Sequence, residues 1–240
     1  MTQLKARPVS DTALNRLRSG FSGRVLSPVD DGFDEARTLF NSMIDLRPGV
    51  IAQCATVDDV RRAIECAREE ELEVAVRGGG HSVAGMGSTH GGLVVDLRRM
   101  NTVAVDEETM SVRVSGGALM RDLDAATAPF GLAAVGGRVS TTGVGGFTLG
   151  GGSGWLERKF GLACDNLLGV DMVTAEGDLV RASADDHPEL FWALHGGGGN
   201  FGVATRMDLR LHPLPEFSFG LLLFPPEAGP AVTRLWRDLM

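Results

Sequence analysis

Tyrosine is missing from the 240 residues of this chain, and cysteine is scarce. The cysteines are odd in number and widely separated, at Cys54, Cys66 and Cys164. They therefore predict free thiols in a reducing compartment, the cytoplasm, rather than a disulfide framework or a zinc-type pair. Because His90, His187 and His212 share no spacing typical of metal ligands, we expect no bound metal.

Long apolar runs and an excess of positive charge are also missing. The sequence contains no run of about 18 apolar residues, so it predicts no membrane-spanning helix. Residues 1–20 carry several basic side chains but no apolar core, and we expect no signal peptide there. A net charge of −8 argues against nucleic acid as the main partner, because phosphate backbones attract basic surfaces.

Glycine, by contrast, is abundant, at 33 of 240 residues, about twice the usual share. These glycines show no Gly-X-Y period, so they indicate special backbone geometry and exclude collagen. With 43% hydrophobic residues the chain can bury a core, and its length allows one or two domains.

The first half of the chain predicts a β-α-β unit. Residues 1–45 have a helical and peripheral pattern, and residues 49–54 predict a short strand. Thr56 is a suitable N-cap for a helix that runs to about Glu70 with apolar residues at helical spacing. Residues 71–76 then predict a strand that delivers a glycine loop at its end.

The rest of the chain predicts mainly strands. Patterns and turn residues indicate strands over 92–97, 102–105, 111–114, 167–174, 178–182 and 203–211, and helices over 119–130 and 187–194. Pro213 and Pro215 then mark a boundary. Beyond it, residues 217–224 predict a strand and residues 227–240 a helix.

The loop after the β-α-β unit is Arg77-Gly78-Gly79-Gly80-His81-Ser82. Bare backbone N–H groups can bind an anion, and glycines let the backbone come close to it. Phosphate binding alone does not need a histidine, so the loop suggests a dinucleotide whose pyrophosphate lies on the amides while the imidazole faces the cofactor. A tight turn with an incidental histidine is the alternative. The G-x-G-x-x-G spacing of an NAD site is missing.

Two further glycine-rich segments adjoin predicted strands. Residues 136–154 would let a flat ring lie on backbone, or would let helices pack closely. Residues 195–205 again form a loop that leads into a strand. We interpret the three segments as parts of one cradle.

The order of these motifs resembles the berberine-bridge-enzyme-like branch of the FAD-linked oxidases, over roughly residues 45–215. The motifs are Arg77-Gly-Gly-Gly-His-Ser-Val-Ala-Gly85, Gly143-Val-Gly-Gly146, Gly150-Gly-Gly-Ser-Gly154, Gly161-Leu-Ala-Cys-Asp-Asn166, Glu189-Leu-Phe-Trp-Ala-Leu194 and Gly199-Asn-Phe-Gly-Val203. The resemblance implies an α+β fold with a PCMH-type FAD-binding domain of two α/β subdomains over 45–214. An N-terminal helical segment, 1–44, would precede it, and 215–240 would start an incomplete substrate-binding domain.

The resemblance also implies a function. The family removes a hydride from a carbon that bears a hydroxyl or amine group, transfers it to FAD and returns the electrons to O2. The substrate would be a small molecule. Because the family's catalytic tyrosine or acid lies in the later domain, we expect the general base outside this sequence. Several alternatives stay open. The chain could be a fragment, a split enzyme with a missing second half, a non-catalytic flavin-binding module or a homo-oligomer. It could also be an NAD-binding or phosphate-binding protein without flavin.

In the family, the residue at His81 is bonded to the 8α carbon of the flavin; a histidine that holds FAD without a bond is the alternative. Where some relatives carry a second attachment site, a cysteine, this chain has Val139, so the resemblance implies a single link. Thr142 stands at the position that gates oxygen. The residues assigned to cofactor binding are Arg77, Gly78, Gly79, Gly80, His81, Ser82, Gly85, Val139, Ser140, Thr141, Thr142, Gly143, Gly145, Gly146, Gly150, Gly154, Asn200, Gly202 and Val203.

Overall fold

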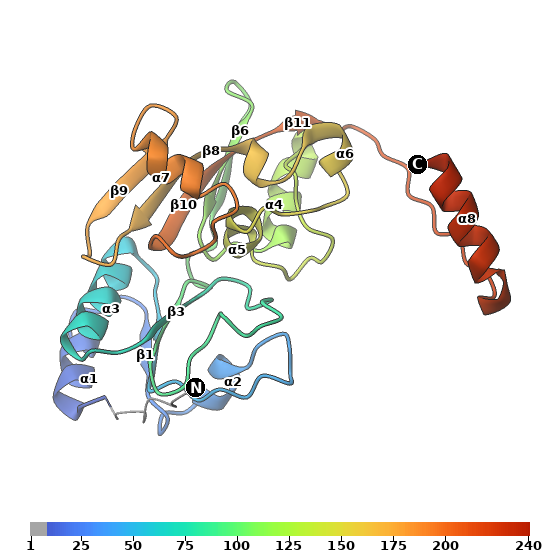
Figure 1. Cartoon of the computed structure of the whole chain (residues 1–240). Helices are drawn as coiled ribbons and strands as arrows, with labels where there is room; N and C mark the ends of the chain where they lie inside the picture. Colours follow the sequence, from blue (N-terminus) through green and yellow to red (C-terminus); the bar gives the residue numbers. More distant parts are fainter. Residues whose placement is uncertain (1–8) are drawn as a thin grey trace.

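The computed structural model describes residues 9–240, so the first eight residues of the predicted N-terminal segment lie outside it. Figure 1 shows two main bodies, one around a four-stranded sheet and one around a five-stranded sheet. Both sheets carry helices, which gives the α+β class that the motifs predict. Helix α8 lies apart from both bodies at the end of an extended segment.

The first body holds the predicted β-α-β unit. Its strands run in the order β1 (Arg24–Leu26), β2 (Val50–Gln53), β4 (Leu93–Asp96) and β3 (Val74–Arg77). Strands β2 and β3 each pair in parallel with β4, so β4 separates the two strands of the unit. Strand β1 pairs with β2 in the antiparallel direction.

Helix α3 (Val57–Glu69) connects β2 to β3 and begins where the sequence predicts. The Thr56 hydroxyl accepts a hydrogen bond from the Asp59 amide, and the Asp59 carboxylate accepts one from the Thr56 amide, which closes a capping box. The buried face of α3 packs against the sheet and against α1 (Asp11–Arg18). This packing fixes the end of β3, where the glycine loop starts.

The second body contains an antiparallel sheet. Its strands run in the order β5 (Val103–Asp106), β6 (Ser111–Ser115), β10 (Val203–Arg210), β8 (Leu167–Val173) and β9 (Leu179–Ser183). The strands predicted at these four places are confirmed, and β5 pairs with β6 and β8 with β9 in the antiparallel direction. Helices α4 (Met120–Thr127), α5 (Val144–Leu149), α6 (Glu157–Phe160) and α7 (Pro188–Ala193) complete this body, with the short pair β7 (Leu132–Ala133) and β11 (His212–Pro213).

Two expectations about local structure differ from what the structure shows. The N-terminal segment is not only helical, because β1 joins the first sheet and α2 (Phe33–Arg37) leads toward the glycine loop. Residues 217–224 form no strand, and helix α8 (Gly229–Leu239) follows them. Within residues 9–240, no helix is long and apolar enough to cross a membrane.

Candidate functional site

Two of the three predicted glycine loops touch each other backbone to backbone. A methyl group placed on Gly79 would lie 2.3 Å from the Gly143 nitrogen and 2.8 Å from the Thr141 carbonyl oxygen. A methyl group on Gly143 would lie 2.3 Å from the Gly79 nitrogen. All three distances are below the 3.0 Å that real β-carbons respect, so only glycine fits where the loops meet.

His81 lies against the second loop. Its Nε2 is 2.9 Å from the Thr141 hydroxyl, and its Nδ1 is 3.4 Å from the Thr142 hydroxyl. The Phe40 ring stacks on the imidazole, with centroids 4.0 Å apart and planes 16° apart. Burial lowers the pKa of His81 below its usual 6.5, so the imidazole is neutral near pH 7.

The first loop offers free donors. The backbone N–H groups of residues 78–82 donate no hydrogen bond to any residue that the structure describes. Such a run of unpaired amides is typical of anion sites, and it is the feature a pyrophosphate requires. The loop therefore fits a dinucleotide as the sequence predicts.

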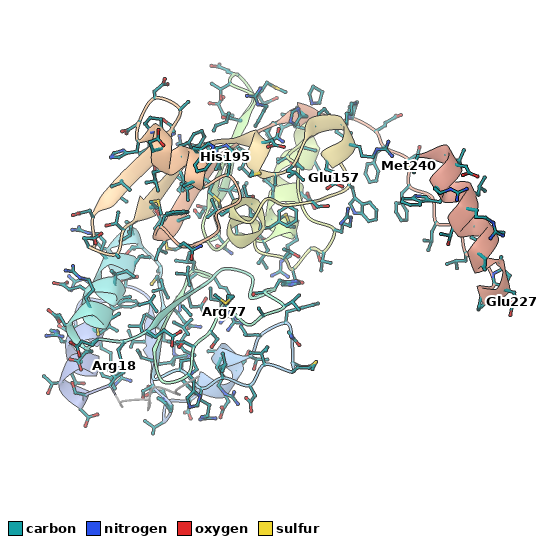
Figure 2. All side chains as sticks on the ribbon, in the orientation of Figure 1. Arg18, Arg77, Glu157, His195, Glu227 and Met240 are labelled. Atoms are coloured by element: carbon teal, nitrogen blue, oxygen red, sulfur yellow. The ribbon has the colours of Figure 1, made fainter. Side chains whose placement is uncertain are left out.

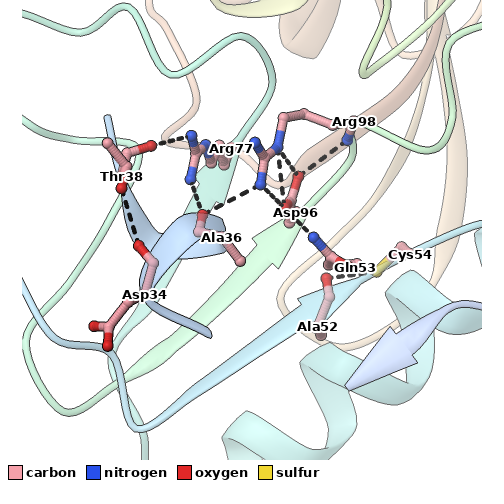
Figure 3. Close-up of polar contacts among 9 residues, drawn as sticks. All are labelled: Asp34, Ala36, Thr38, Ala52, Gln53, Cys54, Arg77, Asp96 and Arg98. Carbon is pink, nitrogen blue, oxygen red and sulfur yellow. Dashed lines mark hydrogen bonds and ion pairs between the residues drawn. The ribbon is translucent and has the colours of Figure 1, made fainter. Parts of the chain in front are cut away.

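Arg77 faces the N-terminal segment. Its guanidinium donates to the carbonyl oxygens of Ala36 and Thr38. Arg98 reaches the same Ala36 carbonyl at 3.2 Å and forms a 2.6 Å ion pair with Asp96. Figure 3 shows how these two arginines converge on Ala36. Arg77 thus ties the segment after α2 to the end of β3.

The charge of Arg77 is buried, and no carboxylate of the described part of the chain forms an ion pair with it. Desolvation, followed by repulsion from Arg98, lowers the pKa of Arg77 to about 10. Its Nε has no hydrogen-bond partner among residues 9–240 and would lie 3.1 Å from a methyl group on Gly80. A buried cation next to unpaired amides favours an anionic ligand over the loop.

The second segment also packs closely around its glycines. A methyl group on Gly145 would lie 3.2 Å from the Gly116 carbonyl oxygen, and one on Gly78 would lie 3.3 Å from the same atom. A methyl group on Gly154 would lie 2.0 Å from the Gly136 carbonyl oxygen. Val139 keeps 46% of its surface exposed on this loop. The glycines here allow backbone to approach backbone, while leaving Val139 accessible.

The third loop joins the site only indirectly. Asn200 donates to the Gly197 carbonyl at 2.8 Å within its own loop, and Gly198 donates to the Leu149 carbonyl at the end of α5. Gly202 lies so close to Val173 that a methyl group would be 2.4 Å from its carbonyl oxygen. In Figure 2 Arg77 lies in the middle of the molecule and His195 in the second body. Cofactor contact by Asn200, Gly202 and Val203 stays a prediction.

The other predicted residues lie at turns around these loops or in and next to helix α5. Ser82 Oγ accepts from the Met86 amide at 3.2 Å, and Gly85 has a φ of 78° that favours glycine. Ser140 accepts from the Arg121 amide at 3.0 Å. Gly146 lies within α5 and Gly150 is its C-cap, and both are exposed.

Sequence reasoning missed Phe40. Its segment looked peripheral, and no periodicity or motif marks a contact between Phe40 and His81. An aromatic residue after the short acidic helix α2 is the only local signal. Among residues 9–240, no cluster of three or more His, Cys, Asp or Glu side chains is arranged to hold a metal ion.

A family model described as the FAD binding domain matches residues 48–183. (R)-6-hydroxynicotine oxidase of Paenarthrobacter nicotinovorans is 43% identical over 208 residues, which cover 86% of this chain and 45% of that protein. An uncharacterized FAD-linked oxidoreductase of Bacillus subtilis (strain 168), YgaK, is 34% identical over 226 residues, or 92% of this chain and 50% of that protein. The chain thus spans about half the length of these curated relatives.

Solved structures agree with the sequence matches. The crystal structure of 6-hydroxy-D-nicotine oxidase from Arthrobacter nicotinovorans matches with a TM-score of 0.79 and 42% identity, covering 80% of this chain and 43% of that one. Glucooligosaccharide oxidase from Acremonium strictum matches with a TM-score of 0.78 and 30% identity, covering 83% and 42%. The flavin of that oxidase is described as 6-S-cysteinyl, 8α-N1-histidyl FAD.

Proposed function

This chain belongs to the FAD-linked oxidases with a PCMH-type FAD-binding domain, and on that premise we propose that it holds FAD by a single covalent bond through His81. The observation that carries the proposal is the position of His81. It lies within the run of amides over a buried arginine, and it contacts the second glycine loop through Thr141.

The residues of the chain fit two parts of the cofactor, the pyrophosphate and the flavin ring. The amides of residues 78–82, with the buried charge of Arg77 behind them, suit the pyrophosphate. Of the glycines at 143, 145 and 146, Gly146 is the exposed one, and a flat ring would lie against the backbone of this segment. When bound, FAD supplies the chemistry of the reaction, accepting a hydride from a carbon that bears a hydroxyl or amine group and passing electrons to O2.

His81 supplies the nucleophile for attachment. Its lowered pKa keeps a lone pair available on the ring near pH 7. In the net reaction one imidazole nitrogen bonds to the 8α carbon, and the imidazole and the 8-methyl group each lose one hydrogen. Dioxygen takes up both hydrogens with two electrons and becomes hydrogen peroxide, so atoms and electrons balance.

Two neighbours of His81 complete the proposal. Val139 cannot form a thioether, so the link through His81 is the only one. Thr142 is small, and we propose that it leaves space for O2 near the flavin. The whole protein would act on a small alcohol, sugar or cyclic amine.

Peptide mapping by mass spectrometry tests this proposal. After digestion of the flavin-loaded chain, we expect one flavin-bearing peptide, with the modification on His81. Assignment to another residue, such as the exposed His90, would refute the attachment site. Peroxide formation with alcohols, sugars and cyclic amines under air would support turnover by the chain itself. Bound flavin without turnover would favour a non-catalytic flavin-binding part.

A further inference from the structure

The Phe40 segment is attached to the first glycine loop on both sides of His81. The Phe40 amide donates to the Gly80 carbonyl at 3.2 Å, and the Asn41 side chain donates to the Val83 carbonyl at 2.9 Å. Arg77 holds the same segment at Thr38. These bonds bring the Phe40 ring over the imidazole and keep it there.

The stacking contact is not part of a hydrophobic core. Phe40 keeps 66% of its surface exposed, yet its ring lies nearly parallel to the His81 ring. It also lies outside residues 48–183, which the FAD-binding family model matches. Since the contact contributes little to burial, its main consequence is to cover one face of the imidazole and restrict its rotation.

Thr141 acts on the edge of the same ring. Its hydroxyl is 2.9 Å from Nε2, whereas the Thr142 hydroxyl is 3.4 Å from Nδ1, which is the weaker contact. The close approach of the Thr141 carbonyl to Gly79 fixes this threonine relative to the loop. A hydroxyl that accepts the Nε2 hydrogen leaves the lone pair on Nδ1.

We propose that Phe40 and Thr141 are positioning residues for flavin attachment: Thr141 selects the tautomer with an unprotonated Nδ1, and Phe40 fixes the plane of the ring. The proposal rests on the covalent role of His81. Neither side chain needs to touch the flavin. Both act by holding the nucleophile in one orientation. Fixed orientation of the reacting groups is the source of most of the rate gain in intramolecular reactions.

The test compares rates of covalent incorporation when apo full-length chain is mixed with FAD under air. We expect Thr141→Val and Phe40→Leu each to slow incorporation about tenfold, because the nucleophile loses its fixed orientation. Thr141→Ser and Phe40→Trp should restore most of the rate. Thr109→Val and Phe130→Leu, at distant exposed positions, serve as matched controls. Equal rates in all variants would overturn the proposal while leaving the His81 bond intact.

A second measurement does not depend on bond formation. Nitrogen-15 chemical shifts of His81 in the apo chain report which ring nitrogen carries the hydrogen. We expect an Nε2–H tautomer in the wild type and a mixture in Thr141→Val, with Thr141→Ser like the wild type. A wild-type Nδ1–H tautomer, or no change in Thr141→Val, would refute the role of Thr141 even if the flavin proved extractable.

Discussion

Replacing Gly79 with alanine tests the contact between the two loops. The new methyl group would lie 2.3 Å from the Gly143 nitrogen and 2.8 Å from the Thr141 carbonyl oxygen, both of them backbone atoms. Because backbone cannot rotate away as a side chain does, the loops must separate. Overpacking of this kind costs about 2 kcal/mol, which corresponds to a fall in melting temperature of about 4–8 °C for a domain of this size.

The assay is thermal unfolding of the apo chain, with Gly146→Ala as the matched control. Gly146 lies in α5, and apart from its own helix no described residue has an atom within 4 Å of a methyl group placed there. Alanine there should leave stability unchanged or raise it by about 0.5–1 kcal/mol, because alanine favours helix over glycine. FAD affinity should fall in Gly79→Ala as the loops part. A Gly79→Ala chain as stable as the wild type would refute the reasoning.

Other predictions concern stability and attachment. Asp59→Ala should lower the free energy of unfolding in urea by about 3 kcal/mol, because the buried carboxylate accepts hydrogen bonds from the amides of residues 22, 23, 55 and 56. Asp58→Ala, at an exposed position, should change the free energy of unfolding little. In a His81→Ala background, Val139→Cys should restore acid-stable flavin through a thioether; free flavin would argue against residue 139 facing the ring. Burial lowers the pKa of His81. Burial, with the positive charges of Arg210 and Lys159, also lowers the pKa of His212. Just below pH 6.5 the unfolded chain therefore binds more protons than the folded chain. Stability should therefore fall as pH drops through that window, and replacing both histidines with glutamine should flatten the profile.

Local patterns in the sequence predicted the elements that carry the site. Thr56 and the spacing of Val60, Ala63 and Ile64 are enough to define α3 and, with it, the strand that ends at Arg77. The order of strands was not predictable, because a β-α-β unit looks the same whether or not another strand separates its two strands. In the structure β4 lies between β2 and β3, and no local sequence pattern predicts this position.

The limits of prediction in the site have a similar cause. His81 and the glycines can be recognised in the sequence because the backbone conformation and the chemistry of the loop require these residue types. Phe40 contacts His81 only through a long-range arrangement that Arg77 and Gly80 hold in place. Residues 217–224 are apolar enough for a strand, but a strand also needs a hydrogen-bonding neighbour, and none of the described strands pairs with them.

Acid precipitation of the flavin-loaded chain tests the central claim most directly. We predict that wild-type protein and the exposed-histidine control His90→Ala keep the visible absorbance of flavin in the washed precipitate. His81→Ala should bind FAD but release it to the supernatant. Flavin that washes out of the wild type, or that stays with His81→Ala, would contradict covalent attachment through His81.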